Sequence, residues 1–170
     1  MAGAGAHIYS GHGFSLRGEK SRFVLPPAFR KMVTESSGDR VLCLAKHERW
    51  NCLTGFGLSR REEFADQIDR EEERALRREE DFDRDLRAMQ LYGFAELPFD
   101  ASGRFVMPDY LADLGRLEHG VFFNGAGSFF TIWNPEELYR QSAGWEAAQA
   151  TCRKLEAETL AKAEGKGARK

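Results

Sequence analysis

Two arginines occupy the same place in two similar segments of this sequence, and they are the side chains best suited to chemistry. Arg22 begins the run Arg-Phe-Val-Leu-Pro, and Arg104 begins the run Arg-Phe-Val-Met-Pro. Each arginine follows a turn-prone stretch and begins a strand, so its guanidinium would point outward from a rigid support. The planar fork of arginine donates paired hydrogen bonds to phosphate or to the edge of guanine. The pattern therefore favours nucleic-acid recognition.

The residues around these arginines predict how they are held. Asp100 lies four residues before Arg104, and Gly103 suits the last position of a type I turn. The Asp100 carboxylate could orient the guanidinium for a ligand, or the two groups could form an ion pair that only braces the turn. Pro26 and Pro108 end the two strands and set the backbone for a first helical turn.

The distribution of charge matters more than its sum. The chain of 170 residues has a net charge of -2 and a pI near 6.1, which argues against a nucleic-acid binder. Residues 15–49 nevertheless sum to +4, while residues 59–90 sum to -4. We expect DNA to approach the basic first repeat and the acidic segment to face away. An ordinary solvated face is the alternative to a DNA-binding patch here, and the contrast with the acidic second repeat favours the patch. Four residues add to it around Arg22: Arg17, Lys20, Arg30 and Lys31.

Other chemistries have little support. The four histidines are scattered, and the three cysteines (Cys43, Cys52 and Cys152) form no CxxC pair. The stretch 124–127 precedes a strand and not a helix, which favours a hairpin over a phosphate loop. We therefore expect no enzyme activity, no metal, no cofactor and no small-molecule substrate. The sequence shows no membrane span and no signal peptide, so we expect a cytoplasmic protein that does not contact a membrane.

The elements that must position the arginines also repeat. The order strand, turn, strand, short helix, strand, turn, strand occurs twice, which predicts an α+β fold with a β-dominated core. The later strands are expected at Arg40–Ala45 with Asn51–Phe56, and at Gly120–Asn124 with Phe129–Trp133.

Helices are predicted between and after the repeats. Ser59 and Glu62 form a capping box for a charged helical connector, with Phe82, Leu86 and Met89 at helical spacing in its second half. Asn134 and Pro135 begin a C-terminal helix. Its apolar stripe is expected to pack on its own chain: Leu138, Trp145, Ala148, Cys152 and Leu155. The end, Glu164–Lys170, is expected to be frayed.

The repeated turn, arginine strand and proline-started helix resemble the AbrB-like unit. Two such units around a charged helical segment resemble the MraZ transcriptional regulators over about Phe14–Tyr139. The resemblance implies two AbrB-like repeats that form one swapped-hairpin β-barrel pseudo-dimer. The implied divisions are a flexible tail (1–13), the first repeat (14–58), the helical connector (59–93), the second repeat (94–139), and the C-terminal helix with a disordered tail (140–170).

The resemblance also implies a function. It predicts a sequence-specific, nucleoid-associated repressor of a cell-division and cell-wall gene cluster, with double-stranded DNA and further copies of itself as partners. A ring homo-oligomer would bind short direct repeats of DNA. The first unit departs from the family pattern, because Gly18 replaces the motif aspartate and Ser21 replaces its glycine. The alternative is an AbrB-like protein-interaction module, such as an antitoxin or an assembly scaffold.

Overall fold

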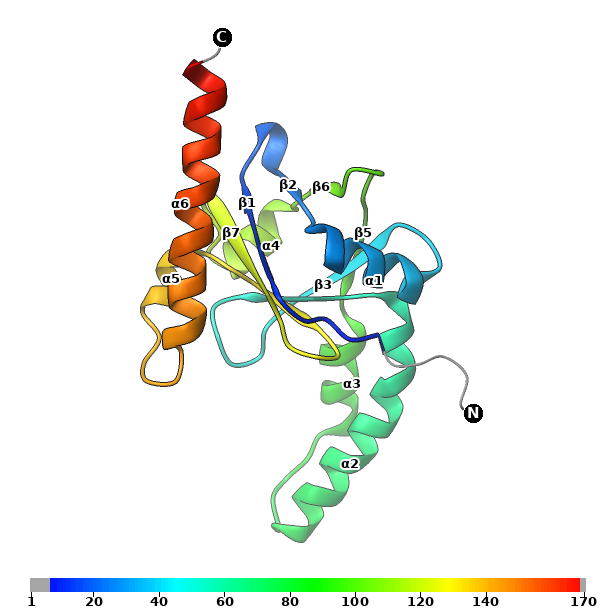
Figure 1. Ribbon diagram of the computed structural model, residues 1–170. Coiled ribbons are helices and arrows are strands. Elements are labelled where there is room, and N and C mark those ends of the chain that lie inside the picture. The colour runs from blue at the N-terminus through cyan, green and yellow to red at the C-terminus, as the bar shows by residue number, and fades with distance from the viewer. Residues whose placement is uncertain (1–6, 169–170) are drawn as a thin grey trace.

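The computed structural model describes residues 7–168 and contains two similar sets of elements (Figure 1). The first set is β1 (His12–Leu16), the 3₁₀ turn η1 (Glu19–Ser21), β2 (Arg22–Val24), α1 (Pro27–Ser37), β3 (Val41–Lys46) and β4 (Leu53–Phe56). The second set is β5 (Ala95–Pro98), β6 (Arg104–Val106), α4 (Asp109–Leu114), β7 (Gly120–Gly125) and β8 (Phe130–Trp133). The predicted repeat of element order is confirmed.

Strand pairing joins the two repeats to each other. A six-stranded sheet has the order β1-β7-β8-β4-β3-β5, and β2 pairs with β6 in a separate two-stranded ribbon. The first strand of each repeat pairs with the other repeat, so that His12 lies opposite Asn124 and Val41 lies opposite Pro98. The predicted α+β class is confirmed. Within residues 7–168 no pairing joins the edge strands β1 and β5, so the sheet is not closed into a barrel by main-chain hydrogen bonds.

Both repeats contribute to one hydrophobic core. Phe29 of α1 stacks on Phe130 of β8, with ring centres 4.9 Å apart, and both side chains are buried. Phe123 of β7 packs against the same pair. Burial of such large aromatic groups is the main free-energy contribution that holds the repeats together.

The ordered chain begins before residue 14. Tyr9 is 2% exposed, and its main-chain N–H donates to the carbonyl of Gly127 at 2.7 Å. Its hydroxyl accepts a hydrogen bond from the N–H of Gly57 at 3.0 Å. Of the expected flexible tail, residues 1–6 lie outside the described residues, while the segment that follows is attached to the core.

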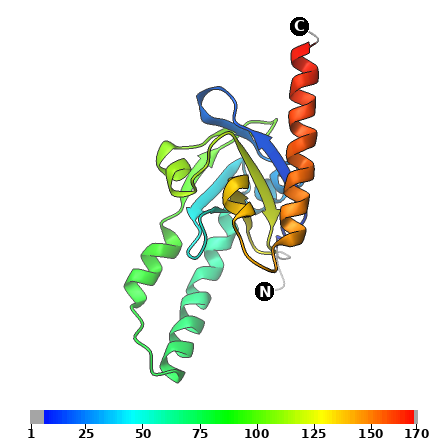
Figure 2. The same ribbon diagram turned by 90° about the vertical axis from the view of Figure 1, so that its left-hand side faces the viewer.

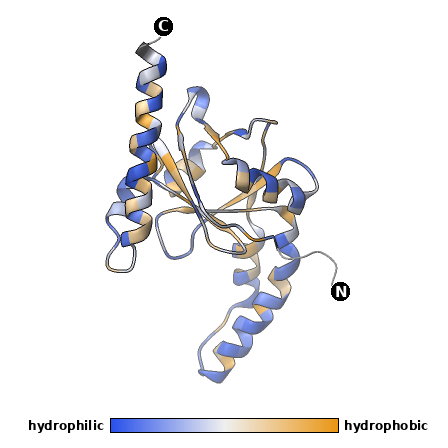
Figure 3. Ribbon diagram, in the orientation of Figure 1, coloured by the Kyte–Doolittle hydropathy of each residue, from blue (hydrophilic) through white to orange (hydrophobic). Residues whose placement is uncertain are grey.

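A helical hairpin separates the repeats. It consists of the 3₁₀ turn η2 (Leu58–Glu63), α2 (Phe64–Arg77) and α3 (Arg84–Tyr92). The hairpin projects from the end of the molecule opposite the β2–β6 ribbon in both views (Figures 1 and 2), and most of its residues are hydrophilic (Figure 3). The acidic segment therefore lies away from Arg22, and the expectation that DNA approaches the Arg22 side stays a prediction.

The predicted capping box is wrong. Ser59 lies inside η2, and α2 begins at Phe64 without a side-chain cap. The Ser59 hydroxyl instead shares a hydrogen bond of 2.5 Å with the hydroxyl of Ser36 on α1. A tertiary contact has therefore replaced the local cap that the sequence motif offers.

The C-terminal helix is interrupted. Asn134 caps α5 (Pro135–Tyr139) as predicted, with its side-chain oxygen accepting from the N–H of Glu136 at 3.2 Å. The chain then leaves the helix and resumes it as α6 (Glu146–Ala168). The expected stripe packs on its own chain, in a cluster with Phe122 and Trp133.

The end of the chain differs from the expectation of fraying. α6 remains helical to Ala168, and the last two residues lie outside the described part. Among the residues described, no helix is long and apolar enough to span a membrane.

Candidate nucleic-acid interface

The β2–β6 ribbon displays both motif arginines on one face. Its register places Phe23 opposite Phe105, and these two rings are buried. Because side chains alternate along a strand, the residues on either side of each phenylalanine point outward. The outer face of the ribbon therefore carries four exposed side chains: Arg22, Val24, Arg104 and Val106.

The two arginines lie at opposite ends of this face. Arg22 is paired with Val106, and Val24 is paired with Arg104, so each arginine has a valine across the ribbon. The valines are 41% and 51% exposed. The sequence analysis missed these two residues, although the alternation of the Arg-Phe-Val triplets could have identified them. Guanidinium groups beside small apolar groups can contact phosphate and the thymine methyl group, respectively.

The turn before Arg104 is fixed by Asp100. One carboxylate oxygen accepts from the main-chain N–H groups of Ser102 and Arg104, both at 2.9 Å. The other oxygen accepts from Nε of Arg104 at 2.8 Å. The main-chain hydrogen bond from Arg104 is the first cause that lowers the pKa of Asp100, followed in the same direction by the bond from its side chain. Arg104 stays 60% exposed, so its Nη groups can still donate to a ligand.

The turn before Arg22 is built differently. Lys20 and Ser21 both have φ of 58°, in the left-handed region that favours glycine. The Ser21 hydroxyl accepts from Nη2 of Arg17 at 2.5 Å, and the N–H of Gly18 donates to the carbonyl of Arg22 at 2.7 Å. Among the described residues, none forms a side-chain hydrogen bond or ion pair with the Arg22 guanidinium. Arg22 is exposed and more free to turn than Arg104.

Arg30 does not point to the outer face. This α1 residue donates from Nη2 to the carbonyl of Leu25 at 3.0 Å and from Nη1 to the carbonyl of Ala101 at 3.4 Å. Its Nε is buried without a partner in the described structure. The side chain lies directly against Gly103, where an added Cβ would be 2.5 Å from Nε. Arg30 therefore links the first repeat to the turn of the second.

The remaining predicted residues divide into two groups. Lys20 and Lys31 are exposed, at η1 and on α1 respectively, and Arg17 is exposed although bonded to Ser21. Pro26 and Pro108 immediately precede α1 and α4, at the ends of the two arginine strands. The structure thus brings Arg17, Lys20 and Arg22 together in one turn.

Cysteine thiols and metal-ligating side chains are the other groups that could carry chemistry. Burial raises the pKa of the Cys43 and Cys52 thiols to about 12, so they are not ionised near neutral pH. Within the part of the chain that is described, no three His, Cys, Asp or Glu side chains are grouped closely enough to hold a metal ion.

Comparisons with known proteins identify the family of this chain. No family model matches the chain. A protein named transcriptional regulator MraZ from Parvibaculum lavamentivorans is 35% identical over 119 residues, which cover 68% of this chain and 69% of that protein. Its namesake in Rhodospirillum rubrum is 34% identical, over 70% of this chain and 74% of its own length. That of Caulobacter vibrioides is 30% identical, over 73% and 75%. On this similarity, the chain belongs to the MraZ family.

Proposed function

We propose that this chain is a sequence-specific DNA-binding transcriptional regulator that contacts DNA with the outer face of the β2–β6 ribbon. The observation that carries the proposal is the presence of Arg22 and Arg104 on one exposed face, on strands that pair directly. The similar proteins are named transcriptional regulators, which supports the same class for this chain. A regulator of this kind needs no catalytic group, and it would be associated with the nucleoid through its DNA.

The residues of the interface have different roles in this proposal. Arg104, held by Asp100, donates in a fixed direction and suits a base edge or one defined phosphate. Arg22 has no such restraint and suits an adaptable contact. Arg17, Lys20 and Lys31 add positive charge for the DNA backbone. Five other residues do not contact DNA in this proposal but hold the second turn and the starts of α1 and α4 in place: Arg30, Asp100, Gly103, Pro26 and Pro108.

The target genes, the assembly and the arrangement of the two repeats are proposed from the resemblance to the family. We propose a repressor of a cell-division and cell-wall gene cluster, assembled as a ring on short direct repeats of DNA. A ring presents the same face several times, so weak single contacts gain from high effective concentration. Direct repeats require equal orientations, which a head-to-tail ring provides. The pairing of β1 with β7 and of β5 with β3 supports a swapped-hairpin arrangement of the two repeats, with the domain divisions given above.

The proposal is tested by the salt dependence of DNA binding. Arg22→Ala should weaken binding to DNA from upstream of the gene and reduce the slope of log affinity against log salt by about one unit. Arg22→Lys should keep the slope, because its contact needs only a positive charge, whereas Arg104→Lys should keep the slope and lose specificity, because lysine lacks the paired donors. Arg77→Ala, on the far end of the helical hairpin, removes the same charge and should change neither quantity. Unchanged affinity and slope in Arg22→Ala would contradict the proposed role.

Assembly is tested by native mass spectrometry with and without that DNA fragment. A defined oligomer that binds DNA would support the ring. A stoichiometric protein partner, together with no DNA retention at low salt, would favour the alternative of a protein-interaction module. The exposed Leu76 of α2 and Met89 of α3 give that alternative some support, since they are 71% and 66% exposed.

A further inference from the structure

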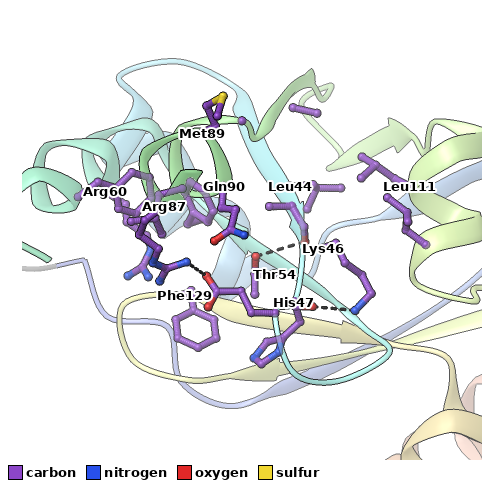
Figure 4. Close-up of a pocket in the computed structure, with 18 of the residues that line it drawn as sticks. Leu44, Lys46, His47, Thr54, Arg60, Arg87, Met89, Gln90, Leu111 and Phe129 are labelled. Carbon is purple, nitrogen blue, oxygen red and sulfur yellow. Dashed lines mark hydrogen bonds and ion pairs between the residues drawn. The ribbon is translucent and has the colours of Figure 1, made fainter. Parts of the chain in front are cut away.

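A cavity of about 720 Å³ is lined by residues of β3, β4, the α2–α3 hairpin and α4 (Figure 4). No residue of β2 or β6 lines it, so it is separate from the proposed DNA interface. Its volume is typical of sites for small organic molecules. Much of its wall is apolar and includes Leu44, Phe56, Phe64, Leu111 and Phe129.

Most charged side chains that line the cavity are positive, whereas the helical segment beside it, residues 59–90, has a negative net charge. Residues 59–90 contain twelve Asp and Glu, yet none of these lines the cavity, whereas Arg60 and Arg87 do. Lys46 of β3 adds a third cation, and Glu48 is the one carboxylate in the lining. The cavity therefore offers positive charge within an acidic part of the molecule.

Arg60 is a half-buried cation with a long ion pair. Its side chain is 18% exposed, and its ion pair with Glu63 is long, at 3.9 Å. The guanidinium carbon lies 5.2 Å from the ring centre of Phe129 and 5.5 Å from those of Phe56 and Phe64. Burial lowers the pKa of Arg60, since the aromatic surroundings replace water poorly. An anion brought to this guanidinium would interact strongly, because water screens the charge incompletely there.

The other two cations differ from Arg60. Arg87 is already paired, with Glu71 at 2.7 and 2.9 Å and also with Glu48. Lys46 Nζ donates to the carbonyls of His47 at 2.7 Å and Trp50 at 2.6 Å, which orient the ammonium but do not neutralise it. Arg60 is therefore the cation best placed to receive an anionic group.

The opposite side of the cavity is apolar and open. Tyr110 and Leu114 of α4 line it and are 58% and 48% exposed, while Met89 of α3, which is 66% exposed, lies on the Arg87 side of the view in Figure 4. Figure 4 places Arg60 and Arg87 at one side of the view and Leu111 at the other. A ligand that reaches across the cavity would meet a cation at one end and cover exposed apolar side chains at the other.

We propose that this cavity binds a small amphipathic anion, with a carboxylate or phosphate head at Arg60 and an apolar body against α4. The charge of the lining selects this ligand over a neutral or cationic one of the same size. A segment of a second copy of this chain is the competing occupant, and the experiment distinguishes the two.

The test is displacement of the fluorescent anion anilinonaphthalene sulfonate from the full chain. Octanoate and octyl phosphate separate the two kinds of head group, and octyl glucoside is the neutral control, each below its critical micelle concentration. We expect saturable displacement by at least one of the two anions and at least about tenfold weaker displacement by the glucoside. No saturable displacement by either anion, or equal displacement by all three compounds, would overturn the proposal.

Variants locate the site. Arg60→Met keeps an apolar chain among the three rings and should weaken the effective anion at least about tenfold, with little effect on the glucoside. Leu114→Glu changes an exposed residue and should weaken the same anion at the apolar end. Arg77→Met is the charge-matched control and should bind as the parent does. If the parent chain binds neither anion and Leu114→Glu dissociates an oligomer, the cavity is occupied by a segment of a second copy of the chain. The measurement involves no DNA, so its outcome is independent of the proposed regulator function.

Discussion

The turns before Arg22 and Arg104 perform the same task in different ways. In the second repeat, Asp100 binds the backbone and the arginine together, and Gly103 takes a φ of 85°. In the first repeat, Gly18 replaces the aspartate, and the left-handed positions fall on Lys20 and Ser21. The Arg104 guanidinium is held by a carboxylate, whereas the Arg22 guanidinium has no side-chain partner among the described residues. The comparison shows how a duplicated unit can keep its fold while the restraints on its two motif arginines diverge.

Gly103→Ala should have the largest effect. A Cβ at this position meets the Leu25 carbonyl at 2.7 Å as well as Arg30, and φ is unfavourable for alanine. We expect a loss of about 3 kcal/mol in the free energy of unfolding, measured in urea. Gly127→Ala has the same φ region but open space around the Cβ, and it should cost about 1 kcal/mol. Equal losses would show that the contact with Arg30 and Leu25 is unimportant.

Arg30→Met should have the next largest effect. It removes the hydrogen bonds to Leu25 and Ala101, and we expect a loss of about 1–2 kcal/mol in stability by thermal unfolding. Lys31→Met, on the same helix but exposed, should leave stability unchanged and lower the salt slope of DNA binding. If Lys31→Met destabilises the chain as much as Arg30→Met does, Arg30 is not the link between repeats.

Asp100→Ala should have a pH-dependent effect. The folded-state pKa of Asp100 is lowered from the ordinary value of 3.8, so its carboxylate contributes stability above that pH. This contribution is lost as the pH falls through the lowered folded pKa. The difference in melting temperature between parent and variant should therefore be full at neutral pH and vanish in acid. Asp113→Ala on α4 is the control, and an equal pH profile for both variants would refute the assignment.

Ser21→Gly should have the smallest effect on the free energy of unfolding, and this effect should be a gain in stability. Glycine relieves the positive φ but loses the bond to Arg17, so we expect a gain of about 0.5 kcal/mol. Ser102→Gly in the second turn has no positive φ to relieve and should not stabilise. A loss of stability in Ser21→Gly would mean that the hydroxyl contact outweighs the backbone strain.

The order of elements could be predicted because it depends on local signals. Pro26 and Pro108 start their helices where expected, and the glycines around residue 126 make the β7–β8 hairpin. These residues act through their own backbone preferences, and distant contacts do not oppose them.

The failures come from tertiary contacts. Ser59 bonds to Ser36 and does not cap a helix. At the candidate interface, Asp100 and Arg104 are neighbours in sequence, so their contact could be anticipated. Arg30 and Ala101 are far apart along the chain, and nothing in their types indicated that they meet. The cavity at Arg60 likewise depends on elements from both repeats and the hairpin.

The pairing of β1 with β7 has a consequence for biosynthesis. Strand His12–Leu16 leaves the ribosome well before its partner Gly120–Gly125, because the rest of the first repeat and the helical hairpin lie between them in the sequence. Until β7 is made, the N-terminal strand has an unpaired edge, which can pair with other chains. Folding of this core must therefore wait for translation of β7 and be slow for its size, because its strand contacts join distant parts of the sequence.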